Sequence, residues 1–232
     1  MKLSLVMPAY NEGEHIEVCV REWHDAVASK LPDTELIVVD DRSKDNTWAI
    51  LQSLRAQLPQ LRPLQTPVNG GHGKAVRYGL LSAQGDFVFQ TDSDRQHDPE
   101  DFWRLWARRE EADFVMGVRE QRADGRVRVV VTSVMRLLNF AVWQVWIKDA
   151  NCPFKLMRRE AMHRVLSRIP EDSFIPMVML SILARRERFR VVEEYVRHRP
   201  RTAGEQSLKG VVKWVKVGAR CASQLIRLRA TV

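Results

Sequence analysis

Cysteine is scarce in this sequence of 232 residues. It has only three cysteines, Cys19, Cys152 and Cys221, and no two of them form a C-x-x-C pair. An odd number at wide spacing argues against a disulfide framework and against a structural zinc site, because both need matched sets of cysteines. We therefore expect a reducing compartment, and specifically the cytoplasm.

A long apolar run suited to crossing a bilayer is also missing. The most apolar stretch, residues 129–147, is interrupted by Arg136, Asn139 and Gln144, so it suits a membrane surface better than a membrane interior. No signal peptide of normal length is visible, because a strand-like run at residues 3–7 follows the first two residues directly.

A nucleotide-binding loop of the common types is absent as well. In the glycine-rich run at residues 69–75, Val68 stands where a Walker loop needs its first glycine, and Ala75 replaces the serine or threonine. The run does not lie in the first strand–helix turn, which argues against a dinucleotide fingerprint. Close approach of the backbone to a ligand, or a plain loop before a helix, fits these glycines better.

The overall composition is that of a globular protein with one sizeable core. The chain is 45% hydrophobic and carries a net charge of +8, from 37 basic and 29 acidic residues. A basic surplus suits phosphorylated substrates, anionic lipid or nucleic acid. We do not expect a nucleic-acid partner, because no known motif is present and the basic residues are dispersed except near the C-terminus.

Short β-branched runs alternate with helical patterns, which predicts an α/β fold with a mostly parallel, Rossmann-like sheet. We expect one domain over residues 1–205 and an amphipathic basic helix within residues 206–232. Strands are predicted at residues 3–7, 35–39, 62–66, 86–90, 113–117 and 189–195. Helices are predicted at residues 12–30, 45–58, 72–83, 99–109, 128–147, 159–167, 175–186 and 208–228. Residues 149–158 are predicted to be irregular or extended.

Two aspartates follow the predicted strand at residues 86–90. Asp92 and Asp94 are one residue apart, and residues i and i+2 of an extended chain point to the same side. Two facing carboxylates repel each other unless a cation lies between them, and carboxylate oxygens are hard ligands suited to Mn²⁺ or Mg²⁺. The alternative is that both are turn residues, since aspartate is common in turns.

Polar residues also follow the first two predicted strands, and active sites of parallel sheets lie at the carboxyl ends of the strands. Asp41 and its neighbour could accept hydrogen bonds from a nucleobase or a ribose, or could cap the next helix. Tyr10 could stack on a base and Glu12 could bind the ribose. A helix start capped by Asn11 is the alternative for that segment.

Together these fragments resemble glycosyltransferase family 2, and within it the dolichyl- and polyprenyl-phosphate mannosyl- and glucosyltransferases. The resemblance runs from residue 3 to about residue 209 and implies a GT-A fold. The motif matches are P-x-Y-N-E at Pro8, Tyr10 and Glu12; V-D-D-x-S at Val39 and Asp41; N-x-G-x-G-x-A from Asn69; and D-A-D-L-Q at Asp92, Ser93, Asp94 and Gln96. The later matches are G-x-R at Arg119; D-x-x-x-G-F-[KR]-L from Asp149; and R-x-x-G-E-S-K at Arg201 and Lys209.

The resemblance assigns roles to these residues. It implies that Pro8, Tyr10, Glu12, Val39 and Asp41 line the nucleoside pocket. It further implies a Mn²⁺ or Mg²⁺ ion held by three residues of one motif, Asp94, Gln96 and Asp92, where Asp92 and Ser93 also meet the donor. Phosphate contacts are implied for the basic residues of the other motifs, Arg119, Arg201 and Lys209.

The sequence departs from the family pattern at three places. Cys152-Pro153 replaces the usual small residue and glycine before Phe154, and Arg95 replaces an apolar residue beside the expected metal ligands. The last motif contains two additional residues, which makes the assignment of Lys209 depend on an insertion.

The implied activity is inverting transfer of a hexose from a GDP-mannose or UDP-glucose type donor to a polyprenyl or dolichyl phosphate. A lipid phosphate is already anionic and needs no base, whereas a sugar hydroxyl needs one. Asp149 is the candidate base by motif position, and its alternative is capping or pairing with Arg158. The alternative functions are transfer to a saccharide hydroxyl and non-catalytic binding of a nucleotide sugar.

The predicted last helix bears on the acceptor. A basic stripe, Lys209, Lys213, Lys216, Arg220 and Arg227, flanks an apolar stripe, Leu208, Val211, Val215, Ala219, Ala222 and Ile226. An apolar face flanked by basic residues suits an anionic lipid surface. We therefore expect peripheral contact with the cytoplasmic face of a membrane, with a helix packed on its own domain as the alternative.

Overall fold

The computed structural model describes residues 2–120, 140–199 and 211–231. Its strands are β1 (Leu3–Ala9), β2 (Thr34–Asp40), β3 (Leu61–Gln65), β4 (Phe87–Gln90), β5 (Phe114–Arg119), β6 (Lys155–Arg158) and β7 (Val191–Val196). Its helices are α1 (Ile16–Ala26), α2 (Thr47–Arg55), α3 (His72–Ser82), α4 (Phe102–Ala107), α6 (Arg159–Leu166), α7 (Pro176–Arg186) and α8 (Val211–Thr231). Two short 3-10 helices are η1 (Ala28–Lys30) and η2 (Pro99–Asp101).

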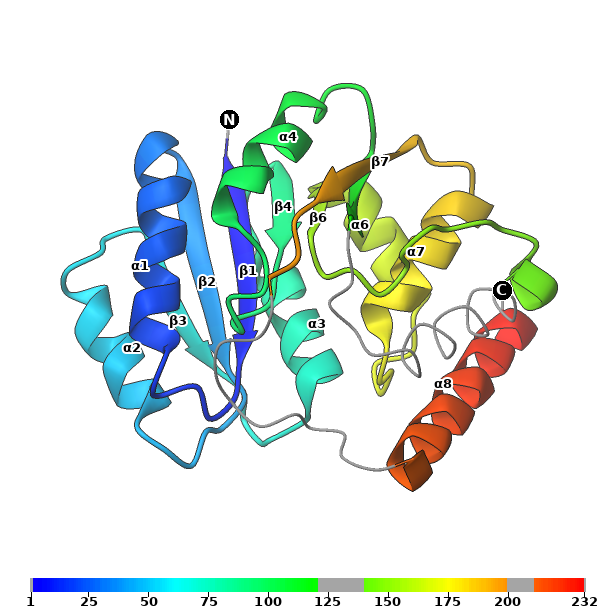
Figure 1. Cartoon of the computed structure of the whole chain (residues 1–232), viewed down its shortest axis with the longest axis horizontal. Coiled ribbons are helices and arrows are strands. Elements are labelled where there is room, and N and C mark those ends of the chain that lie inside the picture. The colour runs from blue at the N-terminus through cyan, green and yellow to red at the C-terminus, as the bar shows by residue number, and fades with distance from the viewer. Residues whose placement is uncertain (1, 121–139, 200–210, 232) are drawn as a thin grey trace.

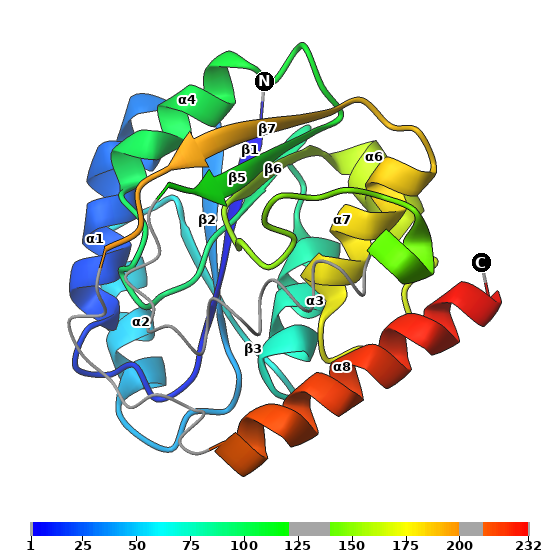
Figure 2. The same ribbon diagram turned by 45° about the vertical axis from the view of Figure 1, so that its right-hand side comes forward.

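The seven strands form one sheet in the order β3-β2-β1-β4-β6-β5-β7. Pairing is parallel for β1 with β2 and β4, for β2 with β3, and for β5 with β7, while β6 runs antiparallel to both its neighbours. Figures 1 and 2 show helices on both faces of this sheet. The prediction of an α/β fold with a mostly parallel sheet is confirmed.

One apolar layer covers each face of the sheet, and side chains that alternate in direction along the strands contribute to both layers. In β1, Val6 belongs to the layer under α3, α6 and α7, whereas Leu5 and Met7 belong to the layer under α1, α2 and α4. A strand buried on both faces needs apolar residues at every position, and every residue of β1 except Ser4 is apolar. The central strands are therefore fixed rigidly, and their carboxyl ends share one edge of the sheet.

A half-buried carboxylate joins the amino ends of three strands. Glu35 of β2 accepts hydrogen bonds from Ser4 Oγ of β1, from the backbone N–H of Gln84 at 2.7 Å and from Arg62 of β3 at 2.9 Å. Burial alone would raise the pKa of Glu35, but the hydrogen bonds from these donors outweigh it and hold the pKa below its usual value.

Helix α8 packs on the domain through residues outside the predicted apolar stripe. Within residues 218–229, where side-chain burial is described, Cys221, Leu225 and Leu228 are buried, and the two leucines belong to the layer around α3, α6 and α7. Ala219 and Ile226 of the predicted apolar stripe are instead exposed. The stripe that the sequence analysis assigned to a lipid surface therefore does not make the contact with the domain at these two positions.

Two predicted elements also needed correction. Helix α1 begins at Ile16 and not at residue 12, because residues 11–15 form a turn that is hydrogen-bonded to the chain after β2. The helix predicted over residues 128–147 is helical at residues 140–143 and has no regular structure at 144–147. Its residues 128–139 lie outside the described part of the chain, as do residues 206–210 of the predicted appendage.

Of the helices within the described ranges, none has both the length and the hydropathy of a membrane span.

Candidate active site

The polar residues predicted to form the site meet at the carboxyl ends of β1, β2 and β4. A cavity of about 450 Å³ opens there. It is lined by Pro8, Ala9, Tyr10, Glu12, Asp41, Asn69, Gly71, His72, Ala75, Asp92, Ser93 and Asp94. Seven of the residues that the sequence assigned to the site therefore share one cavity, which fits the rule that parallel sheets bind ligands at this edge.

The segments after β1 and β2 are joined by hydrogen bonds between side chains and backbone. The N–H of Asn11 donates to Ser43 Oγ at 2.9 Å, and Asn11 Oδ1 accepts from the N–H of Lys44 at 2.8 Å. The N–H of Glu12 donates to Thr47 Oγ1 at 2.9 Å. These contacts hold Tyr10 and Glu12 at the cavity wall before any ligand binds, with Tyr10 41% exposed.

The three strand ends share an unusual backbone conformation. Asn11 follows β1, Arg42 follows β2 and Arg95 follows β4, and each has a positive φ, of 53°, 58° and 57°. Non-glycine residues rarely adopt this conformation, which carries strain that the surrounding contacts must outweigh. At Arg95 that support includes an ion pair with Glu22 of α1. The residue that departs from the family pattern therefore points to α1 and fixes the turn that carries Asp94.

Asp41 organises the loop that leads into α3. Its Oδ1 accepts from Thr66 Oγ1 at 2.8 Å and from the N–H of Gly70 at 3.0 Å, and its Oδ2 accepts from the N–H of Gly71 at 2.6 Å. Asn69 donates to the carbonyl of Asp41 at 2.8 Å. Gly71 has a φ of 82°, which favours glycine, and the loop places His72 at the cavity. Asp41 is therefore both a lining residue and a structural anchor.

Asp92 and Asp94 provide the negative charge of the cavity. Asp92 Oδ1 accepts from Gln90 Nε2 at 3.2 Å and lies 3.7 Å from His72 Nε2, while Asp94 Oδ1 accepts from the N–H of Gln96 at 3.1 Å. Across residues 2–120, 140–199 and 211–231, no three His, Cys, Asp or Glu side chains are grouped as a complete metal site. Two carboxylates in an open cavity still fit Mg²⁺ or Mn²⁺, which take few protein ligands when diphosphate oxygens complete the shell.

Gln96 lies beside the cavity without lining it. Its Nε2 donates to the carbonyl of Arg199 at 3.3 Å, and its own carbonyl accepts from the N–H of Arg199 at 2.7 Å. Arg199 and Arg197 in turn form ion pairs with Asp98, and Arg197 also pairs with Asp101 at 2.7 Å. This network of ion pairs holds residues 197–199 against the segment that carries the candidate metal ligands.

Arg119 and Asp149 form a buried, two-pronged ion pair. Arg119 Nε donates to Asp149 Oδ2 at 2.7 Å and Nη2 donates to Oδ1 at 2.9 Å. Only 12% and 4% of the two side chains are exposed. The expected alternative, a pair between Asp149 and Arg158, is wrong, because Arg158 pairs with Glu110 at 2.7 Å. Neither Arg119 nor Asp149 lines the cavity.

Two buried bases near this ion pair escaped the sequence analysis. Burial lowers the pKa of His97 to about 4, and Asp92, Arg119 and Asp149 all act on the charge of this ring, which places them close to it. Burial also lowers the pKa of Lys155, whose Nζ donates to the carbonyls of Ala150 and Cys152. The adjacency of His97 to Gln96 was the signal available for the histidine. Nothing in the sequence marks a lysine as fully buried.

Among the described site residues, Val39 has the environment that differs most from the one expected from the sequence. Its side chain is fully buried in the layer under α3, and a Cβ built on Gly79 would lie 2.9 Å from it. Any contact of Val39 with a donor must therefore come from its backbone. Arg201 and Lys209 lie outside the described residues, so their roles stay predictions.

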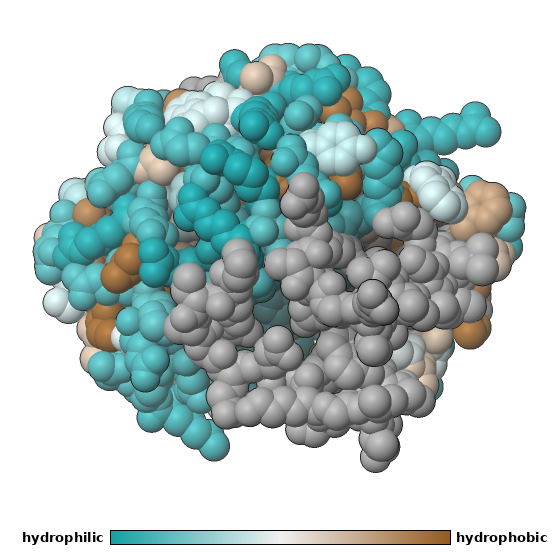
Figure 3. All heavy atoms as spheres, viewed as in Figure 1, coloured by the Kyte–Doolittle hydropathy of each residue, from teal (hydrophilic) through white to brown (hydrophobic). Residues whose placement is uncertain are grey.

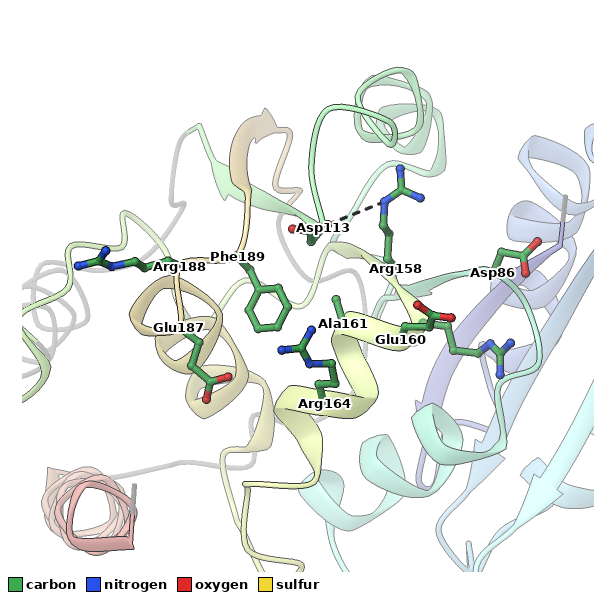
Figure 4. A pocket seen from close by; sticks show the side chains of 10 residues that line it. Asp86, Asp113, Arg158, Glu160, Ala161, Arg164, Glu187, Arg188 and Phe189 are labelled. Atoms are coloured by element: carbon green, nitrogen blue, oxygen red, sulfur yellow. Dashed lines mark ion pairs between the residues drawn. The ribbon is translucent and has the colours of Figure 1, made fainter.

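A larger cavity, of about 590 Å³, lies at the opposite edge of the sheet (Figure 4). Asp86 and Asp113, which precede β4 and β5, line it together with the start of α6 and the end of α7. Its charged lining is balanced between Arg158, Arg159, Arg164 and Arg188 and Asp86, Asp113, Glu160 and Glu187. None of the residues that the sequence assigned to the site is among them, so we place the site in the smaller cavity.

Comparison with known proteins gives the same picture. The glucosyl-3-phosphoglycerate synthase of Mycobacterium tuberculosis, solved with Mn²⁺, UDP-glucose and glycerol 3-phosphate, is 20% identical with a TM-score of 0.69; the match covers 99% of this chain and 80% of that one. The mannosyltransferase PcManGT of Pyrobaculum calidifontis, solved with GDP-mannose and Mn²⁺, is 17% identical with a TM-score of 0.62, over 99% and 73%. S. aureus TarS 1-349 is 21% identical with a TM-score of 0.59, over 86% and 60%, so this chain spans less than two thirds of it.

At these identities the solved structures establish the shared GT-A fold. The family model "Glycosyl transferase family 2" matches residues 4–166, well over half of the chain and all the strands from β1 to β6. The matched range carries every cavity residue and the Arg119–Asp149 pair. The chain belongs to glycosyltransferase family 2.

Proposed function

We propose that the protein transfers a hexose, with inversion, from a nucleoside diphosphate sugar to a polyprenyl or dolichyl phosphate. The observation that carries the proposal is the joint placement of Asp92 and Asp94 with Tyr10, Glu12 and Asp41 around one cavity. A nucleoside diphosphate needs an aromatic or polar wall for the base and a cation for the diphosphate. This cavity offers the two kinds of group on adjacent strand ends.

The cation in this proposal is Mn²⁺ or Mg²⁺, held by Asp94 and Gln96 with Asp92 beside them. When bound, such an ion neutralises the charge that develops on the leaving diphosphate. Support comes from the solved structures of the same fold that hold Mn²⁺ with UDP-glucose or GDP-mannose. Hydrogen bonds within the chain hold the two candidate ligands in place. Asp94 is fixed by its bond to the N–H of Gln96, and Gln96 is fixed by residue 199.

The nucleoside is assigned to the wall formed by Pro8, Tyr10, Glu12 and Asp41, where the exposed ring of Tyr10 provides a stacking surface. The diphosphate is assigned to the space between Ser93 and the start of α3. Arg119 is assigned to a phosphate, as are Arg201 and Lys209 on the family resemblance alone. Charge-assisted hydrogen bonds from guanidinium groups suit phosphate oxygens.

A lipid acceptor is supported by the surface around α8. The N–H of Phe174 donates to Gln224 of α8 at 2.9 Å, and a Cβ built on Gly73 at the cavity rim would lie 2.9 Å from the carbonyl of Phe174. Phe174 therefore lies between α8 and the start of α3 and contacts both. The outward side of α8 exposes 60% of Ile226, beside Arg220 and Arg227.

The chain after residue 139 also exposes aromatic rings. Phe140 and Trp146 are 41% and 55% exposed and pack edge to face. The coloured part of the face shown in Figure 3 is mainly hydrophilic, and its hydrophobic residues form small separate groups. Aromatic side chains together with arginines suit the headgroup region of an anionic bilayer. We therefore propose peripheral attachment at the cytoplasmic face of a membrane.

Flotation with liposomes tests the attachment. The wild type should float with vesicles of phosphatidylglycerol in low salt, and binding should fall as salt screens the arginines. Ile226→Asp should reduce flotation. The matched control is Val18→Asp, because Val18 is 45% exposed on α1. Equal flotation of both variants with the wild type would contradict the proposed surface.

Transfer of label tests the function itself. With Mn²⁺ and polyprenyl phosphate, sugar from labelled UDP-glucose or GDP-mannose should appear in the organic phase. Label that moves only onto an added saccharide would instead support a hydroxyl acceptor. Binding of the donor without transfer or hydrolysis would indicate a non-catalytic nucleotide-sugar-binding protein.

A further inference from the structure

We propose that Asp149 is a positioning residue that fixes the guanidinium of Arg119 for a substrate phosphate, and that it does not act as a base. The inference rests on the proposed function and concerns how its phosphate site is built. It assigns a reason to the buried ion pair at the end of β5, and it adds Lys155 as a residue that supports this pair.

The geometry of the pair leaves little room for a base. Asp149 Oδ2 accepts from Arg119 Nε at 2.7 Å and lies 3.5 Å from the N–H of Arg119, while Oδ1 accepts from Nη2 at 2.9 Å. A proton taken up by either oxygen would remove the negative charge that strengthens both hydrogen bonds, in a site where only 4% of the carboxylate side chain is exposed. A base for an acceptor hydroxyl must instead face the acceptor.

The same geometry fixes Arg119. An arginine side chain has several rotatable bonds, so a free guanidinium would lose much conformational entropy on binding a phosphate. Two parallel hydrogen bonds hold the plane of the group in place beforehand, which is the usual benefit of preorganisation. The backbone of Arg119 is fixed as well, because Arg119 is the last residue of β5 and pairs with Val196 of β7.

The carboxylate is anchored by a separate structure. The N–H of Cys152 donates to the carbonyl of Asp149 at 3.2 Å and closes a turn. The ammonium of Lys155, fully buried in β6, donates to the carbonyls of Ala150 and Cys152 inside that turn. Lys155 thus supplies a donor to the carbonyl of the buried Cys152 and shares the carbonyl of Ala150 with Ser181 Oγ, and it holds the turn against the sheet.

Lys155 also links this turn to the metal candidates. It lies opposite Gln90 in the pairing of β6 with β4, and Gln90 Nε2 donates to Asp92 Oδ1 at 3.2 Å. On the other side it lies opposite Met116 of β5, three residues before Arg119. The central strand β6 therefore ties the carboxylate end of β4 to the guanidinium end of β5, so that negative and positive groups are set at a fixed separation.

A double-mutant cycle on Arg119 and Asp149 separates the two roles of Asp149. We expect Arg119→Ala to weaken the affinity for the preferred nucleoside diphosphate with Mn²⁺ by about 10- to 100-fold, the value of a charge-assisted hydrogen bond. Asp149→Asn should weaken the same affinity by about tenfold. The double variant should bind no more weakly than Arg119→Ala, because Asp149 acts only through Arg119.

Arg119→Lys is a second variant for the case in which Asp149→Asn or Arg119→Ala does not fold. It leaves Asp149 intact and keeps the positive charge, but it cannot form the two-pronged pair, so we expect it to lose nucleotide affinity as Asp149→Asn does. Asp113→Asn is the matched control. Asp113 also pairs with arginines, Arg190 at 3.1 Å and Arg158 at 4.0 Å, but at the opposite edge of the sheet. Its nucleotide affinity and turnover should equal those of the wild type.

A base role predicts a different pattern. Asp149→Asn would then bind nucleotide as the wild type does and lose about 10²- to 10⁴-fold in turnover, also in the Arg119→Ala background, while Arg119→Lys would retain nucleotide affinity. That pattern would overturn the inference and leave the proposed function standing. A wild type that binds no nucleoside diphosphate would overturn both.

Discussion

Replacing Asp41 by asparagine tests whether this carboxylate is an anchor as well as a ligand contact. Asp41 is 2% exposed and accepts three hydrogen bonds, from Thr66 Oγ1 and from the N–H groups of Gly70 and Gly71. In Asp41→Asn one oxygen becomes an NH₂ group that faces a donor. At least one bond to a charged acceptor is therefore lost, worth about 1.5–3 kcal/mol, and the others become neutral and weaker. We expect a loss of about 2–4 kcal/mol in the free energy of unfolding.

Urea denaturation followed by circular dichroism measures this change, and calorimetry with UDP or GDP measures the effect on binding. Thr66→Val removes one donor of the three and should lose about 1 kcal/mol of stability. Asp40→Asn is the control, because buried Asp40 accepts from Gln65 at 2.7 Å and from the N–H of Ser43 but does not line the cavity. It should lose stability and keep nucleotide affinity. A change below about 0.5 kcal/mol for Asp41→Asn would refute this reasoning, because ordinary surface substitutions lie in that range.

Three further predictions follow from other parts of the structure. Gly117→Ala should lose about 1–3 kcal/mol of stability in urea denaturation, because its Cβ would lie 2.8 Å from the carbonyl oxygen of Phe154. A variant as stable as the wild type would show that the backbone moves away from the added methyl group without cost. The pKa of Glu35 is lower in the folded than in the unfolded state, so its contribution to stability is present above pH 4.5 and is lost as the pH falls through the folded-state pKa. The stability difference between wild type and Glu35→Gln should therefore shrink below pH 4.5, and a constant difference would contradict the assignment. Burial raises the pKa of the Cys152 thiol to about 11, so a thiol reagent at pH 8 should label it only after unfolding.

Much of the fold follows from local patterns in the sequence. β1, β2, β4 and β5 are short apolar runs between turn residues, and a strand buried on both faces has to be such a run. β6 carries no such signal, because it is four residues long and includes Lys155 and Arg158. Lys155 is fully buried there and donates to carbonyls of the turn before β6, and only the assembled structure shows that this turn folds back onto the lysine.

The site was predictable to the extent that it lies at strand ends. The strand-end rule and the motif spacing together brought Tyr10, Glu12, Asp41, Asp92 and Asp94 into one group, and the structure places all five at one cavity. Which ions pair is a different question, because pairing partners lie far apart in the chain. For this reason the ion pair of Asp149 with Arg119, thirty residues away, was not predicted, and the alternative partner considered for Asp149 was Arg158.

The packing of α8 is another contact that could not be predicted from the sequence. The sequence analysis identified one apolar stripe on this helix, which includes Ala219 and Ile226, and did not identify Leu225 and Leu228 as a second apolar face. The structure buries Leu225 and Leu228 instead, since they fill the layer beside α7. The stripe that stays exposed is the one on which we base the membrane surface.

Calorimetry of nucleoside diphosphates with and without Mn²⁺, on the wild type and on Asp94→Asn, tests the central claim most directly. The account predicts that Mn²⁺ strengthens the binding of UDP or GDP to the wild type at least about tenfold, a gain of about 1.4 kcal/mol, and that Asp94→Asn loses this gain. Equal affinities with and without the ion, for every nucleotide tried, would contradict a cation site at the end of β4.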